Sequence, residues 1–265
     1  MTRPVRLRDL ANEFDTFFLD VWGVLHTGEG PLPGVLDTLR AARDAGTRIV
    51  LLTNTSRLGP QVVETLGKIG ITRDLFTDVV TAGDVTRDAI VARDPAIFRD
   101  LPASPAAFHF GARDYVPWLF ELGLDLDATP EDAQLVFATG AVSNEQALDR
   151  ARETLRPAAR RRVPLVCTNP DRVIPTSSGP KLGPGAVAAA YAAEGGPIFL
   201  YGKPHPPIYA EAQRRAGDAR VVAMGDLVDT DVAGARAAGL AAALIGAVPE
   251  DATITPDFVL SAFAW

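Results

Sequence analysis

Short apolar runs that end at a polar residue recur along the chain. Residues 16–19 (Thr-Phe-Phe-Leu) and 48–52 (Arg-Ile-Val-Leu-Leu) are two such runs, and they are followed by Asp20 and Thr53. Strands of a parallel sheet that is buried on both faces have this pattern. Between the two runs, residues 34–45 carry apolar side chains at helical spacing and are followed by a glycine, a common helix stop. The order strand, helix, strand predicts a βαβ unit.

The same alternation returns in the last third of the chain. A helix at 60–69 and a strand at 76–80 extend the first βαβ unit. The later strand-like runs are residues 198–201, 220–224, 241–245 and 257–260, and the later helical patterns are 207–215 and 231–238. Strands that alternate with helices favour an α/β fold with a doubly wound, mostly parallel, Rossmann-like sheet.

The middle of the chain has elements of its own. Its strand-like runs are residues 107–110, 135–138 and 165–167, and its helical patterns are 112–122, 144–155 and 183–193. We therefore expect a discontinuous core domain of residues 1–81 and 197–265. Residues 82–196 would form an inserted α/β cap domain over the carboxyl edge of the core sheet.

Composition narrows the classes of function. The chain has 265 residues, 47% of them apolar, with 26 basic against 33 acidic residues and a net charge of −7. This acidic balance argues against a nucleic-acid partner. No apolar stretch approaches the roughly 20 residues that cross a bilayer, so no membrane partner is expected. The single cysteine, Cys167, lies in an apolar run and excludes an internal disulfide, and a reducing cytoplasm fits this usage.

Polar residues that suit phosphoryl transfer fall at the predicted carboxyl ends of strands. Asp20 and Thr53 follow two strands directly, Asp226 follows a third after one glycine, and Lys203 lies in the loop after a fourth. In open α/β sheets, ligands bind at this edge. Carboxylates hold Mg²⁺, while an ammonium and hydrogen-bond donors neutralise phosphate oxygens. Taken alone, Asp226 could be an ordinary turn residue, and Lys203 could be an ordinary surface lysine.

Four segments resemble, in order, the motifs of the haloacid dehalogenase superfamily. They are Asp20-Val21-Trp22-Gly23-Val24-Leu25, Leu51-Leu52-Thr53-Asn54, Gly202-Lys203-Pro204 and Gly225-Asp226-Leu227-Val228-Asp229-Thr230-Asp231. In addition, Thr168-Asn169-Pro170-Asp171, followed by a glycine-rich turn and the helix that begins at Pro184-Gly185-Ala186, is similar to the NagD-like branch, subfamily IIA. That branch has a large cap between its second and third motifs.

The resemblance implies a magnesium-dependent hydrolase. Asp20 would be the nucleophile that forms an aspartyl-phosphate intermediate. The carboxylates of Asp20 and Asp226 and the main-chain carbonyl of Trp22 would bind Mg²⁺. Asp231 would be an inner- or outer-shell acid, although taken alone it could be a helix cap.

The resemblance also implies the phosphate and substrate contacts. Thr53 and the Asn54 amide would hold the phosphate, and Lys203 would offset charge on the nucleophile and the phosphate. In the cap, Asn169 and Asp171 are candidate substrate-binding residues. Other polar positions near the site are Arg57 and the turn Ser177-Ser178-Gly179. The expected partner is a small phosphorylated metabolite, and caps of this branch often form homodimers.

Trp22 departs from the usual pattern. Phosphatases of this family usually carry an aspartic acid there, two residues after the nucleophile, as general acid for the leaving oxygen. An indole N–H cannot donate its proton at any useful pH, and loss of a general acid lowers the reaction rate by about 10²–10⁴-fold. The substrate could have a good leaving group, or His26 or His205 could supply the proton. A dehalogenase-like hydrolase, whose leaving group needs no proton, and a catalytically weak phosphate-binding or regulatory protein are the remaining alternatives.

Overall fold

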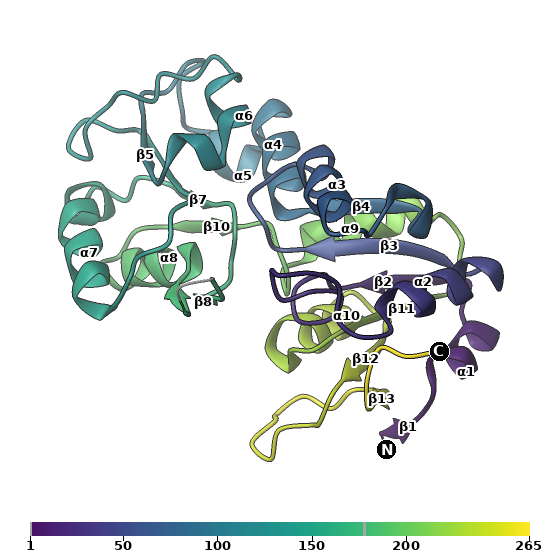
Figure 1. The fold of residues 1–265 in the computed structure, drawn as a ribbon. Coiled ribbons are helices and arrows are strands. Elements are labelled where there is room, and N and C mark those ends of the chain that lie inside the picture. The colour runs from purple at the N-terminus through teal and green to yellow at the C-terminus, as the bar shows by residue number, and fades with distance from the viewer. Residues whose placement is uncertain (1, 177–178) are drawn as a thin grey trace. The chain divides into compact units, whose positions relative to one another are not determined.

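The computed structural model describes residues 2–176 and 179–265. The chain forms two compact units (Figure 1). The first unit consists of Met1–Thr53, Gly59–Thr81 and Lys203–Trp265. The second consists of Asn54–Leu58 and Ala82–Gly202. Each unit contains a parallel sheet and a hydrophobic cluster of its own.

The first unit is built on a seven-stranded sheet in which every pair of neighbouring strands is parallel. The strands lie in the order β1 (Arg3–Pro4), β13 (Phe258–Leu260), β12 (Ala241–Ile245), β11 (Val221–Gly225), β2 (Thr16–Leu19), β3 (Arg48–Thr53) and β4 (Asp78–Thr81). From β2 the chain adds strands in one direction, and from β11 it adds them in the other. The strand order therefore reverses between β2 and β11, as in a doubly wound sheet, and the predicted fold class is confirmed.

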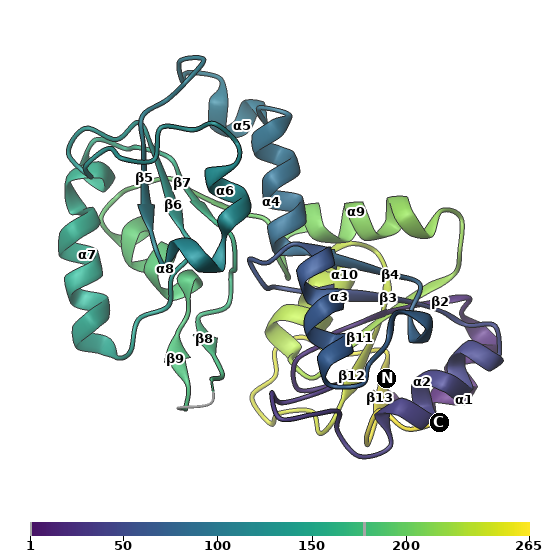
Figure 2. The ribbon, with the colours of Figure 1, turned by 45° about the horizontal axis from the view of Figure 1, so that its top comes forward.

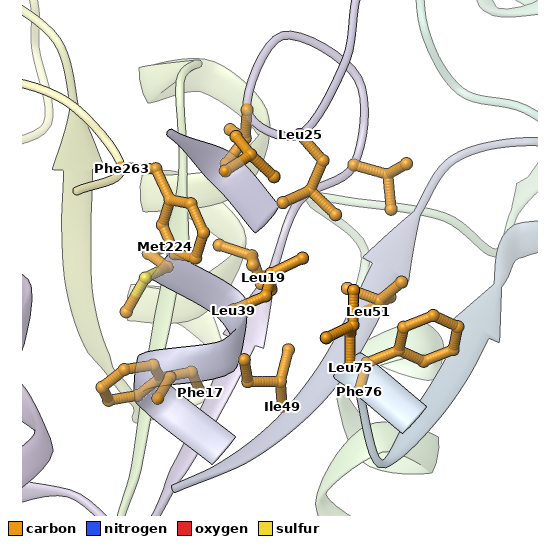
Figure 3. Packing of buried hydrophobic residues seen from close by; sticks show 14 of the residues in the cluster. Phe17, Leu19, Leu25, Leu39, Ile49, Leu51, Leu75, Phe76, Met224 and Phe263 are labelled. Atoms are coloured by element: carbon orange, nitrogen blue, oxygen red, sulfur yellow. The ribbon is translucent and has the colours of Figure 1, made fainter. Parts of the chain in front are cut away.

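Helices cover both faces of this sheet. Side chains of α1 (Leu7–Glu13), α2 (Val35–Asp44) and α3 (Gly59–Lys68) share one buried cluster with alternate strand residues. Figure 3 shows part of it, with Phe17 and Leu19 of β2 near Ile49 and Leu51 of β3. On the other face, α9 (Pro206–Ala216) contacts β3 and β4, and α10 (Ala233–Ala237) contacts β12. Burying each large aliphatic side chain contributes about 1.5–3 kcal/mol to the stability of this core.

The second unit has a four-stranded parallel sheet and a short antiparallel hairpin (Figure 2). The sheet has the order β10 (Ile198–Leu200), β7 (Leu165–Cys167), β6 (Leu135–Ala138) and β5 (Ala107–Phe110), and the hairpin joins β8 (Val173–Ile174) to β9 (Lys181–Leu182). Apolar residues of α7 (Glu145–Arg160) and α8 (Pro184–Ala193) pack on one face of the sheet. The remaining helices of this unit are α4 (Ala82–Val91), α5 (Pro95–Phe98) and α6 (Pro117–Phe120). Among all the helices described, none is both long and apolar enough to cross a bilayer.

Two boundaries differ from those expected from the sequence. The strand predicted at 198–201 was assigned to the core, but β10 pairs with β7 of the second sheet, with Ile198 opposite Leu165. The chain returns to the first unit at Lys203 rather than at residue 197. Residues 54–58, also assigned to the core, group with the second unit. Local sequence predicts a strand, but it does not reveal the strand's partner.

Two predicted helices also differ in form. The helix expected at 112–122 is broken into a 3₁₀ turn, Arg113–Tyr115, and α6. Pro117 is the cause, because a proline disfavours helical geometry at the residue before it, and Val116 has φ −134° and ψ 55°. The helix expected at 231–238 begins earlier, as a π-helical turn at Val228–Val232, and continues as α10.

Candidate functional site

Four charged side chains meet where the strand order of the first unit reverses. Asp20 directly follows β2, and Asp226 directly follows β11. Lys203 Nζ lies 2.6 Å from Asp20 Oδ1 and 2.7 Å from Asp231 Oδ1, so one ammonium donates to two carboxylates. The side chains of these three residues are almost entirely buried. The sequence predicted all four residues, and the fold brings them together.

Two glycines leave the space that the carboxylates occupy. Gly23 has φ +84°, and a Cβ atom there would lie 2.2 Å from Asp226 Oδ2. A Cβ atom at Gly225 would lie 2.1 Å from Asp231 Cγ. Any larger residue at either position would displace a carboxylate. The glycines of the first and fourth motifs are therefore part of the site, a role that the sequence analysis did not assign to them.

The π-helical turn aims Asp231 back toward the strand end. Asp231 Oδ2 accepts a hydrogen bond from the Leu227 main-chain N–H at 3.1 Å, which leaves Oδ1 for Lys203. Tyr209 of α9 supports the turn, since its hydroxyl lies 3.2 Å from the carbonyl oxygens of both Thr230 and Asp231. Tyr209 was not predicted. Its only sequence signal was a tyrosine on the helix that follows the Gly-Lys-Pro motif.

Burial and mutual charge shift the pKa values of these groups. Burial raises the pKa of Asp20 to about 8, against the opposing effect of the Lys203 ammonium. Burial, and next the negative charge of Asp231, also raise the pKa of Asp226. Burial alone would lower the pKa of Lys203, but Asp20 and Asp231 outweigh it and hold that pKa above its ordinary value. The site therefore favours a protonated lysine and has more carboxylates than one lysine can neutralise.

The carboxylates fit a divalent cation. Asp20, Asp226 and Asp231 each offer an oxygen atom within 4.8 Å of the others. With all three carboxylates ionised, one ammonium would leave two negative charges unbalanced, and the raised pKa values of Asp20 and Asp226 reflect this excess. In addition, Asp226 Oδ1 is buried and has no hydrogen-bond partner within the described part of the chain. An orphaned buried oxygen is costly unless it binds an ion or water, and hard oxygen ligands are those that Mg²⁺ prefers.

Trp22 is held by the loop that follows β2. Its ring stands edge-to-face with that of His26, with the centroids 5.1 Å apart. A Cβ atom at Gly28, where φ is +112°, would come within 3.2 Å of the indole. The Gly28 main-chain N–H donates to His26 Nδ1 at 3.2 Å, so that nitrogen carries no proton. Burial also lowers the pKa of His26. The geometry therefore makes His26 a support for Trp22, and it does not favour His26 as the missing acid.

The predicted phosphate and substrate residues fall in both units. Thr53 ends β3 in the first unit, while Asn54 groups with the second. The Asn54 side-chain amide donates to Asp171 Oδ1 at 2.7 Å. The Asn169 side-chain oxygen accepts the main-chain N–H of Asp171 at 2.9 Å. Asn169 and Asp171, the two candidate substrate residues of the second unit, are therefore bonded to each other, and Asp171 also holds the Asn54 side chain.

The remaining candidates have surroundings of their own. Arg57 lies over the ring of Tyr115 within the second unit, 5.1 Å from its centroid. His205 precedes α9 and makes no side-chain capping bond, and burial lowers its pKa. In the proposed turn at 177–179, Ser177 and Ser178 lie outside the described residues.

Comparison with known proteins places the chain in one family. The family model of haloacid dehalogenase-like hydrolases matches residues 17–124, and a second model of HAD-hydrolase-like proteins matches residues 200–264. Among solved structures, a haloacid dehalogenase-like family hydrolase from Brucella suis is 33% identical, with a TM-score of 0.82 over 98% of this chain and 99% of that one. A 4-nitrophenylphosphatase from Thermotoga maritima is 25% identical, with a TM-score of 0.71 over 96% of each chain.

Several sequence relatives are phosphatases by name. The D-glycerol 3-phosphate phosphatase of Mycobacterium tuberculosis is 27% identical over 90% of this chain, and the match spans 65% of that enzyme's length. The dihydroxyacetone phosphatase of Corynebacterium glutamicum is 29% identical over 90% of this chain and 84% of that enzyme. With the four motif segments and the sheet order, these matches show that the chain belongs to the haloacid dehalogenase superfamily of hydrolases, in its NagD-like branch.

Proposed function

We propose that this chain is a Mg²⁺-dependent phosphatase of small phosphorylated metabolites, with Asp20 as its nucleophile. The observation that carries the proposal is the buried cluster in which Lys203 bridges Asp20 and Asp231, with the orphaned Asp226 oxygen nearby. Phosphoryl transfer depends mainly on positioning and on neutralising charge, and this cluster supplies both. The names of the phosphatase relatives support phosphate monoesters of short carbon chains as the substrate class.

In the proposed reaction, a carboxylate oxygen of Asp20 attacks phosphorus and displaces the leaving group with its bonding electrons. The Lys203 ammonium orients Asp20 and offsets charge on the transferred phosphoryl group. Water then attacks the phosphorus of the aspartyl phosphate, releases inorganic phosphate and restores the carboxylate. An acyl phosphate is reactive enough for this second step to need less assistance than the hydrolysis of an alkyl phosphate.

We propose that the carboxylates of Asp20 and Asp226 and the main-chain carbonyl of Trp22 hold Mg²⁺, with Asp231 beside it. When bound, the ion would neutralise phosphate charge. It would also favour the ionised form of Asp20, whose pKa burial has raised. Thr53 and the Asn54 amide would hold the phosphate, and Asn169 would face the rest of the substrate. Dimerisation through the second unit and a cytoplasmic location stay predictions.

The test is turnover of p-nitrophenyl phosphate and acetyl phosphate by the purified chain, with Mg²⁺ and with excess chelator. We expect turnover that chelation abolishes and that Mg²⁺ restores. Asp20→Asn should lower kcat by at least about 10³-fold, because it removes the nucleophile. Turnover that survives Asp20→Asn would assign the chemistry to another residue. Binding of phosphate and Mg²⁺ without turnover of either ester would favour the binding-protein alternative.

A further inference from the structure

The segment Asn54–Leu58 follows the last residue of β3 directly, yet it groups with the second unit. The boundary between the two units thus falls at the peptide bond between Thr53 and Asn54, the two residues to which the proposed function gives the phosphate. What fixes this segment therefore also fixes the main-chain amide of Asn54. The contacts of Ser56, in the middle of the segment, show what fixes it.

Ser56 is completely buried and bonded through both its side chain and its main chain. Its hydroxyl lies 2.5 Å from the hydroxyl of Thr168, which is also completely buried. Its carbonyl oxygen accepts the indole N–H of Trp118 at 2.9 Å. Thr168 directly follows β7 and Trp118 belongs to α6, so two separate elements of the second unit grip one residue.

The neighbours of Ser56 are held just as closely. The Gly83 main-chain N–H donates to the Thr55 carbonyl at 3.0 Å. A Cβ atom at Gly83 would lie 2.3 Å from the Ser56 carbonyl oxygen, so the segment packs directly on the start of α4. At Gly202, a Cβ atom would lie 2.4 Å from Asn54 Oδ1. The segment is therefore a packed part of the second unit and leaves little freedom to the Asn54 backbone.

We propose that Thr168 is a positioning residue for phosphate binding. Through Ser56 it fixes the segment Asn54–Leu58, which carries the main-chain amide of Asn54. Trp118 holds the main-chain carbonyl of the same residue. This inference rests on the proposed function, because it takes from it the phosphate-binding role of Asn54. It assigns to a buried threonine outside the carboxylate cluster a part in substrate affinity.

The chain offers a matched control. Thr139 is another buried threonine, and it directly follows the neighbouring strand β6. Its hydroxyl lies 2.7 Å from His109 Nε2, so it also bonds to one side chain, but that partner is not on the segment. Thr168→Val and Thr139→Val each remove one buried hydroxyl at nearly constant volume. Thr168→Ser keeps the hydroxyl and is the rescue variant.

The experiment measures inhibition of p-nitrophenyl phosphate hydrolysis by inorganic phosphate, with Mg²⁺ present, and a thermal melt for each variant. We expect Thr168→Val to raise the phosphate Ki and the substrate KM about 5-fold, the effect of one lost hydrogen bond, with a smaller change in kcat. Thr139→Val should lose a similar amount of Tm but keep the phosphate Ki within 2-fold of the wild-type value. Thr168→Ser should return Ki to near the wild-type value. Equal shifts of Ki in the two valine variants, or no rescue by serine, would overturn the proposal.

Failure of the proposed function would be seen separately, as a wild-type chain that hydrolyses no phosphate ester. Titration calorimetry with inorganic phosphate then replaces the kinetic assay for the same variants. A selective loss of phosphate affinity in Thr168→Val would still support the positioning role. A wild-type chain that binds no phosphate would overturn it.

Discussion

Trp22 lies two residues after Asp20, and its ring packs against the ring of His26 and close to the backbone at Gly28. With no acid at this position, the cost should grow with the leaving group's need for a proton. Acetyl phosphate releases acetate and p-nitrophenyl phosphate releases a stabilised phenolate, whereas a sugar phosphate must release an alkoxide. We therefore expect kcat/KM to fall in the order acyl, aryl, alkyl phosphate. Steady-state kinetics on small substrates of comparable KM would check this order.

Trp22→Asp restores an acid and should selectively raise turnover of the alkyl phosphate, by about 10-fold or more. The substitution also removes the ring that packs against His26, so a thermal melt must first show that the variant folds. Trp22→Phe is the control, since it keeps an aromatic ring and adds no acid. An unaltered chain that hydrolyses alkyl phosphates as fast as acetyl phosphate would show that another residue donates the proton.

His109 of β5 gives a prediction about pH at the same scale. Burial, and next the nearby Arg113, lower the pKa of His109 to about 4. Between its unfolded value near 6.5 and this value, only the unfolded chain takes up the proton, so stability falls as pH decreases through that window. We expect a loss of about 1 kcal/mol from pH 7 to pH 5, a figure reduced because the ring is only half-buried. His109→Gln keeps a partner for Thr139 and should lose less Tm over the same range, as measured by scanning calorimetry.

Among the elements, α9 acts on the site through one hydroxyl. Tyr209 holds two carbonyls of the π-helical turn that carries Asp231. Tyr209→Phe keeps the packing of α9 and removes this support, so we expect Mg²⁺ affinity and kcat/KM to fall about 10-fold, as for other outer-shell partners of metal ligands. Tyr201→Phe, which loses a hydroxyl bond to Asp94 in the second unit, is the matched control. Equal Mg²⁺ titrations for the wild-type chain and Tyr209→Phe would contradict the supporting role.

The sequence predicted elements well where a local pattern determines them. The runs at 16–19, 107–110, 135–138, 165–167 and 241–245 became strands with those bounds. It failed where the outcome depends on distant parts of the chain, as for β10, whose apolar run fits either sheet. It also missed α1, α4, α5 and the β8–β9 hairpin, which are short or only weakly patterned.

The candidate site divides in the same way. Asp20 and Asp226 could be named from their motifs and from their positions, because strand ends of a parallel sheet meet at one edge. Lys203 and Asp231 could be named from their motifs alone, since the strand before Lys203 belongs to the second sheet and Asp231 lies in the π-helical turn. The contacts of Gly23 and Gly225, the hydroxyl of Tyr209 and the burial of Ser56 could not, because each depends on a backbone approach that no local pattern encodes. Asp171 is a further example: its substrate role stays a prediction, and the bond that its carboxylate accepts from the Asn54 amide was not foreseen.

At the scale of the whole molecule, each unit has its own sheet and its own buried cluster. A ligand that binds one unit should therefore protect that unit first. All four charged residues of the proposed metal site lie in the first unit. The second unit contributes no carboxylate to this cluster among the residues that the structure describes.

Hydrogen exchange measured by mass spectrometry can test this division. Mg²⁺ at 100 times its Kd stabilises the state that binds it by about 2.7 kcal/mol, which slows exchange through global opening of that unit roughly 100-fold. We expect such slowing in peptides that contain β2 and β11, and much less in peptides that contain β6 and β7. Asp226→Asn removes one of the proposed ligands and should abolish most of the effect in the first unit. If Mg²⁺ protected both units equally in the wild-type chain, the two clusters would unfold as one cooperative structure. If Asp226→Asn left the protection unchanged, the ion would bind elsewhere, and the orphaned oxygen of Asp226 would need another partner.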